Sequence, residues 1–243
     1  MKGVILAGGL GSRLSPLTKI TNKHLLPIYD KPMIYYAIEM LVEAGIEDIM
    51  IVTGGNNAGD FLRLLGNGNQ FGLKHIHYTY QEGEGGIAQA LSLARYFIDG
   101  EKVVVVLGDN ILEKSIAPYV KAFKKQKKGA RILLKEVPDP NRFGVPVFNG
   151  DKVVAIEEKP KKPKSQYAVI GVYFYDGRVF DIIDKLKPSE RGEFEISDVN
   201  NDYIKKSEME SDVIDGWWTD AGLFDSLLKA SNLIAQKNAK KGK

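Results

Sequence analysis

A glycine-rich segment near the N-terminus carries residue types that could hold a phosphate. The stretch LAGGLGSRLSPLT spans residues 6–18 and follows the apolar residues 3–5. Small residues at positions 7, 8, 9, 11 and 12 would let backbone N–H groups approach a polyphosphate, and Arg13 adds a planar side chain that is always charged. A tight turn with an incidental arginine is the alternative that this spacing alone leaves open.

Two common phosphate-binding patterns do not fit the segment. The P-loop string Gly-x-x-x-x-Gly-Lys-Ser/Thr does not occur in the chain. A dinucleotide fingerprint would need a glycine where Leu14 stands, and an acidic residue where Thr53 and two glycines end the second predicted strand. The segment therefore argues against kinase-like and hydride-transfer chemistry.

Four charged residues elsewhere are further candidates for phosphate or metal chemistry. Asp109 comes directly after a strand-like run that contains four valines, and Asp220 lies more than a hundred residues later. Lys23 follows the glycine-rich segment, and Lys159 opens a basic run. A turn aspartate or a solvated lysine is the alternative at each position.

Composition excludes several classes of protein and site. The chain of 243 residues has no cysteine, which excludes disulfides, thiolate metal sites and a cysteine nucleophile. No signal pattern and no apolar run of about 20 residues is present, so we expect a cytoplasmic protein without a membrane partner. A net charge of +3 is too small to indicate nucleic acid. The pair His75 and His77 lacks a third ligand nearby and predicts an exposed strand face.

The first half of the chain alternates between strand and helix patterns. The valine run predicts a strand buried on both faces of a parallel sheet, and ligands of such sheets bind at the carboxyl ends of the strands. The glycine-rich segment and Asp109 both fall at such ends. The predicted strands are 4–7, 46–53, 75–80 and 102–107, and the predicted helices are 32–44, 61–65 and 87–97.

After about residue 130 the pattern changes to strands joined by short turns. We therefore expect an α/β protein with a doubly wound, mostly parallel, Rossmann-like sheet and a smaller, partly antiparallel subregion. A single domain, 1–243, is expected because no linker or repeat divides the chain. The predicted strands here are 131–137, 143–148, 152–157 and 167–175, and the predicted helices are 176–186, 196–205 and 226–236.

Eight motifs in a fixed order connect the chain to a known family. They are LAGGLGSRLSPLT, KHLLPIYDKPM (23–33), VLGDN (106–110), RFGV (142–145), EEKP (157–160), RGE (191–193), ISDVN (196–200) and WTDAG (218–222). Together the motifs span nearly the whole chain. With them the chain resembles the sugar-1-phosphate nucleotidylyltransferases, and among these the glucose-1-phosphate thymidylyltransferases.

The resemblance implies attack of a sugar 1-phosphate on the α-phosphorus of a nucleoside triphosphate, with release of pyrophosphate. The implied substrates are dTTP and α-D-glucose 1-phosphate, the product is dTDP-glucose, and the implied cofactor is Mg²⁺. A phosphate monoester is already an anion near neutral pH, so the single in-line displacement needs no general base. It needs positive charge that offsets the repulsion between two anions.

The resemblance also implies a set of site residues in two subregions, nucleotide-binding (1–130) and sugar-phosphate-binding (131–243). The implied catalytic residues are Arg13, Lys23, Lys159 and Asp109, and the implied metal ligands are Asp109 and Asp220. The nucleotide would be bound by Leu6, Gly8, Gly9, Gly11, Ser12, Arg13, Lys23, His24, Gln81, Gly86 and Asp109. The sugar phosphate would be bound by Asn110, Gly144, Glu158, Lys159, Val169, Tyr173 and Trp218, although Trp218 could equally belong to the core.

Departures from the family pattern keep alternatives open. Glu82 and Glu84 stand where the family usually has prolines near the base, so UTP or another triphosphate is the alternative to dTTP. A non-catalytic sugar-nucleotide-binding regulator with the same fold is the alternative of another class. A homo-oligomer is implied by the family, and a short form without C-terminal regulatory helices is expected to lack feedback regulation of that kind.

Overall fold

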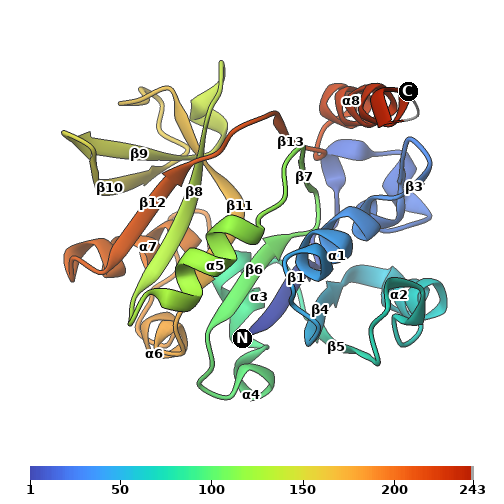
Figure 1. The fold of residues 1–243 in the computed structure, drawn as a ribbon, viewed down its shortest axis with the longest axis horizontal. Coiled ribbons are helices and arrows are strands. Elements are labelled where there is room, and N and C mark those ends of the chain that lie inside the picture. The colour runs from blue at the N-terminus through green and yellow to red at the C-terminus, as the bar shows by residue number, and fades with distance from the viewer. Residues whose placement is uncertain (242–243) are drawn as a thin grey trace.

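A nine-stranded mixed sheet forms the centre of the computed structural model, which describes residues 1–241 (Figure 1). The strand order is β10-β9-β11-β6-β1-β4-β5, and β8 and β12 extend the sheet from β11. The strands are β1 (Lys2–Ala7), β4 (Ile49–Gly54), β5 (Ile76–Gln81), β6 (Val103–Leu107), β8 (Ala130–Glu136), β9 (Gly144–Asn149), β10 (Lys152–Glu158), β11 (Tyr167–Tyr175) and β12 (Met209–Val213).

The parallel part of the sheet is buried on both faces, as the valine run predicts. Strands β6, β1, β4 and β5 run parallel to one another. Val104 and Val106 face one hydrophobic cluster and Val103 and Val105 face the other, because successive strand side chains point to opposite faces. The doubly wound, mostly parallel sheet is therefore confirmed.

Helices cover both faces of this sheet. One cluster contains buried residues of α1 (Met33–Glu43), α2 (Ala58–Leu65) and α5 (Ala117–Lys125), and Figure 1 shows α1 and α5 on the near face. The other cluster contains residues of α3 (Gly86–Ser92), α4 (Arg95–Ile98), α6 (Val179–Ile183) and α7 (Ile196–Lys205). Among residues 1–241 no helix is long and apolar enough to cross a membrane.

The antiparallel strands of the second half join the same sheet. β11 runs antiparallel to β6, and β8 and β9 run antiparallel to β11. In the sheet, β6 therefore has β1 from the first half of the chain on one side and β11 from the second half on the other. This arrangement places residues from both halves around one edge of the sheet.

Two short ladders were not anticipated by the sequence analysis. β7 (Asn110–Leu112) pairs with β13 (Trp218–Asp220), and β2 (Pro27–Ile28) pairs with β3 (Lys31–Pro32). Segments of two or three residues are too short to display an alternating pattern. In the first ladder Asn110 lies opposite Asp220.

Four predicted helices differ from the observed ones, and the one expected over 61–65 begins three residues earlier, at Ala58. The helix expected over 87–97 is divided between α3 and α4 by a tighter turn, in which the Ala94 N–H donates to the Leu91 carbonyl at 3.0 Å. The helix expected over 176–186 is shorter, because the Asp176 carboxylate accepts bonds from the N–H groups of Gly129 (2.6 Å) and Arg178 (3.2 Å) and turns the chain there. The last helix, α8 (Phe224–Lys241), continues past residue 236 through polar residues, and residues 242–243 lie outside the described chain.

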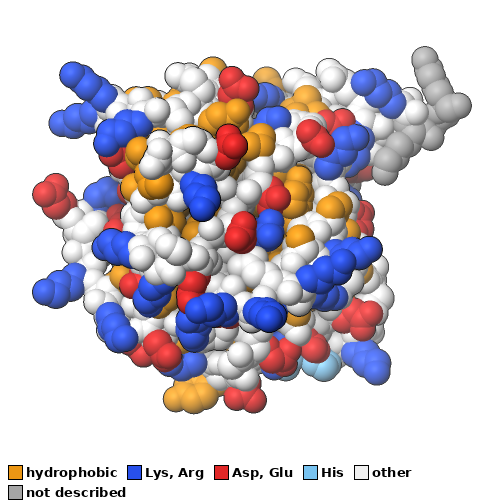
Figure 2. All heavy atoms as spheres, turned by 60° about the vertical axis from the view of Figure 1, so that its left-hand side comes forward, with side chains coloured by type: hydrophobic (Ala, Val, Ile, Leu, Met, Phe, Trp, Pro, Cys, Tyr) orange, Lys and Arg blue, Asp and Glu red, His pale blue; other side chains and the backbone are white. Residues whose placement is uncertain are grey.

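Charges of both signs are interspersed on the face shown in Figure 2, as the small net charge implies. Lys161, Lys162 and Lys164, expected to be plain surface charge, are all exposed. His75, which directly precedes β5, and His77 on β5 are both exposed, as predicted.

We expect Gly54→Ala to lower the free energy of unfolding. A Cβ at Gly54 would lie 2.7 Å from the Gly8 carbonyl oxygen and 2.9 Å from the Gly8 Cα, and backbone atoms cannot yield as a flexible side chain does. Overpacking of this kind costs about 1–3 kcal/mol, measurable by urea unfolding.

The matched control is Gly59→Ala. Gly59 lies in α2, and among the described residues no atom outside its chain neighbours and its own helix backbone lies within 4 Å of an added Cβ. Alanine there should stabilise the protein by roughly 0.5–1 kcal/mol. Equal stability of the two variants would contradict the close approach of β4 to the glycine-rich segment.

Candidate active site

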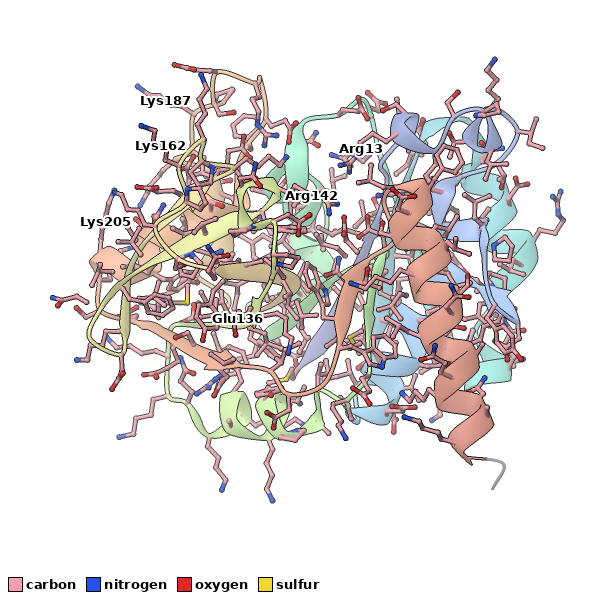
Figure 3. The ribbon with its side chains drawn as sticks, turned by 90° about the horizontal axis from the view of Figure 1, so that it is seen from above. Arg13, Glu136, Arg142, Lys162, Lys187 and Lys205 are labelled. Carbon is pink, nitrogen blue, oxygen red and sulfur yellow. The ribbon has the colours of Figure 1, made fainter. Side chains whose placement is uncertain are left out.

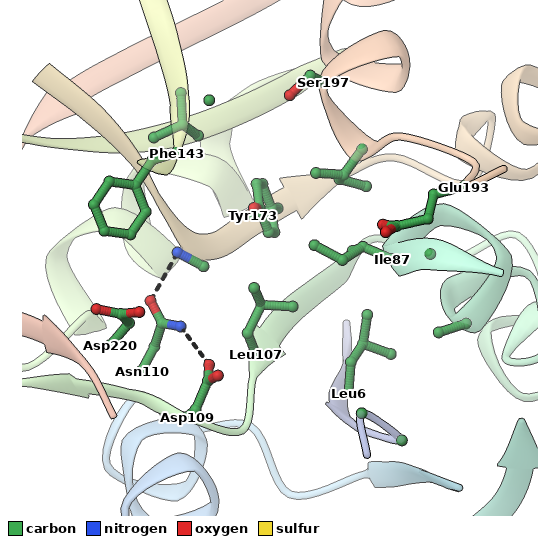
Figure 4. Close-up of a pocket in the computed structure, with 18 of the residues that line it drawn as sticks. Leu6, Ile87, Leu107, Asp109, Asn110, Phe143, Tyr173, Glu193, Ser197 and Asp220 are labelled. Carbon is green, nitrogen blue, oxygen red and sulfur yellow. Dashed lines mark hydrogen bonds between the residues drawn. The ribbon is translucent and has the colours of Figure 1, made fainter. Parts of the chain in front are cut away.

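One cleft of about 410 Å³ collects the candidate residues at the carboxyl ends of β1, β5 and β6 (Figure 4). Its walls also include residues of β9, β10, β11, α7 and β13. Every residue expected to bind nucleotide, sugar phosphate or metal lines this cleft, except Gly11 and Ser12. The structure thus brings together residues from the whole length of the chain.

The glycine-rich segment fits closely between the strand ends. A Cβ at Gly8 would lie 2.7 Å from the Gln81 Oε1 atom, so only glycine allows this contact without a shift. Gly11 has a φ of +66°, a left-handed conformation that favours glycine. Leu14 is fully buried and holds the short 3-10 turn 12–14, while the exposed Arg13 lines the cleft.

The β7–β13 ladder brings the two candidate metal ligands together. Next to the Asn110–Asp220 pair, the Ala221 N–H donates to the Asp109 carbonyl at 2.8 Å. A Cβ at Gly222 would lie 3.5 Å from Asp220 Oδ2 and 3.7 Å from Asp109 Oδ2. It would also lie 3.3 Å from an Arg13 guanidinium nitrogen, so two carboxylates and one cation converge beside this glycine.

Asp109 is held by a cation on one oxygen and an amide on the other. Lys23 Nζ lies 2.5 Å from Oδ2, and Asn110 Nδ2 donates to Oδ1 at 2.9 Å (Figure 4). Burial opposes the charge on Asp109, but Lys23, His24 and Asn110 outweigh it and hold the pKa of Asp109 well below its usual range. The carboxylate is therefore ionised at neutral pH.

Asn110 has its carbonyl oxygen fully engaged. Its Oδ1 accepts a bond from the Gly171 N–H and another from the Trp218 indole N–H, each at 2.8 Å. These bonds orient the amide so that its nitrogen meets Asp109. Asn110, expected from the resemblance on the sugar side, therefore also fixes the Asp109 carboxylate, and the buried Trp218 fixes Asn110.

Asp220 is paired with Arg142, which the sequence analysis did not assign to the site. An Arg142 guanidinium nitrogen donates to Asp220 Oδ2 at 3.0 Å and to Oδ1 at 3.3 Å. Burial raises the pKa of Asp220 above its ordinary value, against the effect of Arg142 and with that of the nearby Asp109 charge. Figure 3 shows Arg13 and Arg142 near the middle of the molecule, while Lys162, Lys187 and Lys205 lie at its periphery.

The half of the cleft opposite the glycine-rich segment contains a second carboxylate arrangement. Ser197 Oγ donates to Glu158 Oε2 at 2.5 Å, and a Cβ at Gly144 would lie 3.1 Å from that hydroxyl oxygen. The other oxygen, Oε1, lies 3.8 Å from Lys159 Nζ and 3.7 Å from an Arg191 nitrogen, beyond hydrogen-bond distance. Glu158 is therefore oriented by Ser197 and keeps one oxygen for a ligand.

Lys159 adopts a backbone conformation that L-residues rarely take. Side chains alternate along a strand, so Glu158 and Lys159 should point to opposite faces, yet both line the cleft. Lys159 has a φ of +43° and donates its N–H to the Phe143 carbonyl at 3.0 Å. The left-handed turn at the end of β10 breaks the alternation and brings both charges to one cleft.

The sequence analysis missed several residues that line the cleft. Arg142, Ser197 and Asn200 belong to motifs quoted for the family resemblance but received no role. Each was recognisable as a polar residue within such a motif. Their partners, however, come from distant segments and cannot be identified from the sequence.

Two carboxylates are the groups that could hold a metal ion here. Among residues 1–241 no three histidines or carboxylates are grouped to hold an ion alone. Asp109 and Asp220 suit Mg²⁺, which binds a few protein oxygens and keeps waters and substrate oxygens in its shell. The convergence of their Oδ2 atoms beside Gly222 fits such an ion.

Comparison with known proteins agrees with this geometry. The chain matches the family described as Nucleotidyl transferase over residues 2–237. It is 44% identical over 238 residues to a glucose-1-phosphate thymidylyltransferase of Neisseria meningitidis, covering 96% of this chain and 82% of that protein. A glucose-1-phosphate thymidylyltransferase of Mycolicibacterium smegmatis is 43% identical, with 100% and 85% covered.

Solved structures share the fold. A Bacillus anthracis protein, provisionally assigned as a glucose-1-phosphate thymidylyltransferase and solved with sucrose, superposes with a TM-score of 0.92 at 53% identity, covering 96% of this chain and 94% of that one. A UDP-glucose pyrophosphorylase bound to UDP-glucose has a TM-score of 0.86 at 26% identity, covering 97% and 98%.

We expect His24→Gln to reduce the acid sensitivity of folding. Burial, aided by Lys23, lowers the pKa of His24 from 6.5 to about 3. The unfolded chain binds a proton near pH 6.5 and the folded protein does not, so stability falls as pH drops below 6.5. Between pH 7 and pH 5 this histidine should account for about 2 kcal/mol.

Urea unfolding at pH 5 and pH 7 measures the difference between wild type and the variant. His75→Gln is the control, because His75 is an exposed histidine. An unchanged pH dependence in His24→Gln would show that the folded protein binds the proton as readily as the unfolded chain.

Proposed function

The chain belongs to the nucleotidyl transferase family, and on that premise we propose that it transfers a thymidylyl group from dTTP to glucose 1-phosphate and releases pyrophosphate. The names of its relatives supply the substrates. The observation that carries the proposal is the convergence of Arg13, Asp109 and Asp220 beside Gly222 in a cleft that also contains Lys23 and Lys159. A non-catalytic binding protein would not need this set of charges.

The cations of the cleft suit a reaction between two anions. We propose that Arg13 and Lys23 bind the triphosphate along the glycine-rich segment, where Arg13 stabilises the departing pyrophosphate. Lys159 binds the phosphate of the sugar and holds it in line with the α-phosphorus. The nucleophile is already deprotonated, so positioning and charge stabilisation are the protein's main contributions.

Asp109 and Asp220 are the proposed ligands of Mg²⁺. When bound, the ion would offset negative charge on the reacting phosphates. Asn110 keeps Asp109 in place by its bond to Oδ1, and Arg142 holds Asp220. Lys23, which contacts Asp109 Oδ2, would exchange that carboxylate for a phosphate oxygen when the triphosphate enters.

The proposed base site lies at Gln81 and Gly86. Gln81 Nε2 contacts Gln89 Oε1 at 2.5 Å and the Gly86 carbonyl at 3.3 Å, so its amide is already oriented at the cleft wall. Both N–H groups of the amide are used in these bonds, so Gln81 Oε1 is left to accept a hydrogen bond from an N–H group at a pyrimidine edge. Glu84, a departure from the family pattern, is exposed and lines the same cleft.

Pyrophosphate release tests the reaction directly. The protein with Mg²⁺ and glucose 1-phosphate should release pyrophosphate with dTTP, and more slowly with UTP, ATP, CTP or GTP. Absence of release with every triphosphate would refute the enzyme, and faster release with UTP would correct the base.

Lys159→Met should lower kcat/KM by about 10²- to 10³-fold, the loss typical of one removed charge-stabilising donor. Lys161→Met is the matched control, because Lys161 is two residues away, is exposed and does not line the cleft. Similar activities of the two variants would remove Lys159 from the proposed mechanism.

Asp220→Asn should weaken metal binding in the presence of dTTP. Loss of an outer-shell partner typically costs roughly 10–100-fold in metal affinity, and loss of a ligand should cost at least as much. Electron paramagnetic resonance of Mn²⁺ measures this without turnover. Asp139→Asn is the control, since Asp139 also pairs with Arg142 but does not line the cleft; equal Mn²⁺ affinity in both variants would exclude Asp220 as a ligand.

A further inference from the structure

Asn200 on α7 is a buried polar residue at the wall of the cleft. Its exposed fraction is 0%, yet it is one of the residues that line the cleft. Protein atoms therefore cover nearly all of its surface at this wall of the cleft. Neither the sequence analysis nor the proposed mechanism gives it a task.

Tyr175 sets the orientation of the Asn200 amide. The Tyr175 side chain is fully buried, and its hydroxyl donates to Asn200 Oδ1 at 2.6 Å. A buried hydroxyl needs an acceptor, and the amide nitrogen cannot be one. The carbonyl oxygen of Asn200 therefore faces Tyr175, and the Nδ2 group is directed elsewhere.

The Nδ2 group has no hydrogen-bond partner among the described residues. It is one of three buried side-chain polar atoms without a partner there, and the other two belong to Gln126 and Arg131, which do not line the cleft. Leaving a buried amide donor unsatisfied is unfavourable. An unsatisfied donor at a cleft wall indicates a group that a ligand satisfies.

The neighbours of Asn200 place it in the half of the cleft proposed for the sugar. Ser197 lies one helical turn earlier on the same face and donates to Glu158. Tyr173 stacks on Tyr175 with ring centroids 6.1 Å apart, and it also lines the cleft. The phosphate-binding candidates Arg13 and Lys23 come from the other half.

We propose that Asn200 Nδ2 donates a hydrogen bond to a hydroxyl oxygen of the sugar and so helps to select the sugar 1-phosphate. This inference rests on the proposed function, because it takes the substrate class from it. Glu158 Oε1 accepts a bond from a sugar hydroxyl, and Asn200 supplies the complementary donor from the same side. A site that hydrogen-bonds a hydroxyl discriminates strongly against an analogue that lacks it.

The test uses the double variant Tyr175→Phe/Asn200→Leu with Tyr175→Phe as its matched control. Removing both partners of a buried bond leaves no orphaned hydroxyl, so the double variant avoids the main cause of misfolding. Calorimetry measures the Kd of dTDP-glucose and of dTDP. The ratio of the two constants reports binding in the sugar half without turnover.

In wild type, dTDP-glucose should bind more tightly than dTDP. In Tyr175→Phe the ratio should fall only in part, because the Asn200 donor remains although the bond that orients its amide is lost. In the double variant that ratio should fall by about 10-fold or more, while the Kd of dTDP stays the same. Deoxy-sugar analogues of dTDP-glucose identify the hydroxyl, because the analogue that lacks it should bind wild type and the double variant with nearly equal affinity.

An unchanged ratio in the double variant would overturn the inference and assign the Nδ2 group to an ordered water. Equal affinity of wild type for dTDP-glucose and dTDP would overturn it as well. If the double variant fails to fold, Asn200→Asp keeps the acceptor for Tyr175 and replaces the donor by a carboxylate oxygen, so the same fall is expected. The pyrophosphate assay of wild type judges the proposed function separately.

Discussion

The arrangement of the cleft depends on two carboxylates that are held close together, although the cleft is proposed to bind anionic phosphates. Asp109 lies between β6 and β7 and Asp220 ends β13, and their Oδ2 atoms approach the same point beside Gly222. A ladder of three residue pairs between β7 and β13 connects segments more than a hundred residues apart. Without this ladder mutual repulsion would separate the two carboxylates, and the cleft would lose its proposed metal site.

Cations around the two carboxylates offset the electrostatic repulsion between them. Lys23 pairs with Asp109 and Arg142 pairs with Asp220, so each carboxylate has a cation of its own. Lys23 also suits a phosphate oxygen, so an incoming triphosphate would replace Asp109 as its partner, while Arg142 would stay with Asp220. The ion pair with Asp109 and the proposed contact with the triphosphate are thus two uses of the Lys23 charge.

The sequence supported the central fold because local patterns report burial. Four consecutive valines indicated a strand buried on both faces, and the helix expected over 196–205 is α7 to the residue. The β7–β13 ladder escaped prediction because three-residue strands carry no readable alternation. The helix around Asp176 was overestimated, since its turn depends on a bond to Gly129, 47 residues away.

The sequence predicted which residues line the site, but it did not predict which of them hydrogen-bond to one another. The family motifs and matching positions named nineteen residues, and all of these except Gly11 and Ser12 line one cleft. They could not reveal that Asn110 orients Asp109, that Ser197 orients Glu158, or that Asn200 has an unsatisfied donor. These relations follow from the strand register and helix packing, which join distant segments.

Lys159 illustrates why sequence rules fail at such a site. Strand alternation would place it opposite Glu158, whereas the positive φ brings both residues to the cleft. A left-handed conformation at a residue other than glycine costs of order 1–3 kcal/mol, and Pro160 restricts its backbone further. A lysine that was only a solvated surface charge would not need this strained backbone conformation. The strain is explained if the ammonium group must stand beside Glu158, where a sugar phosphate would need a cation and an acceptor at once.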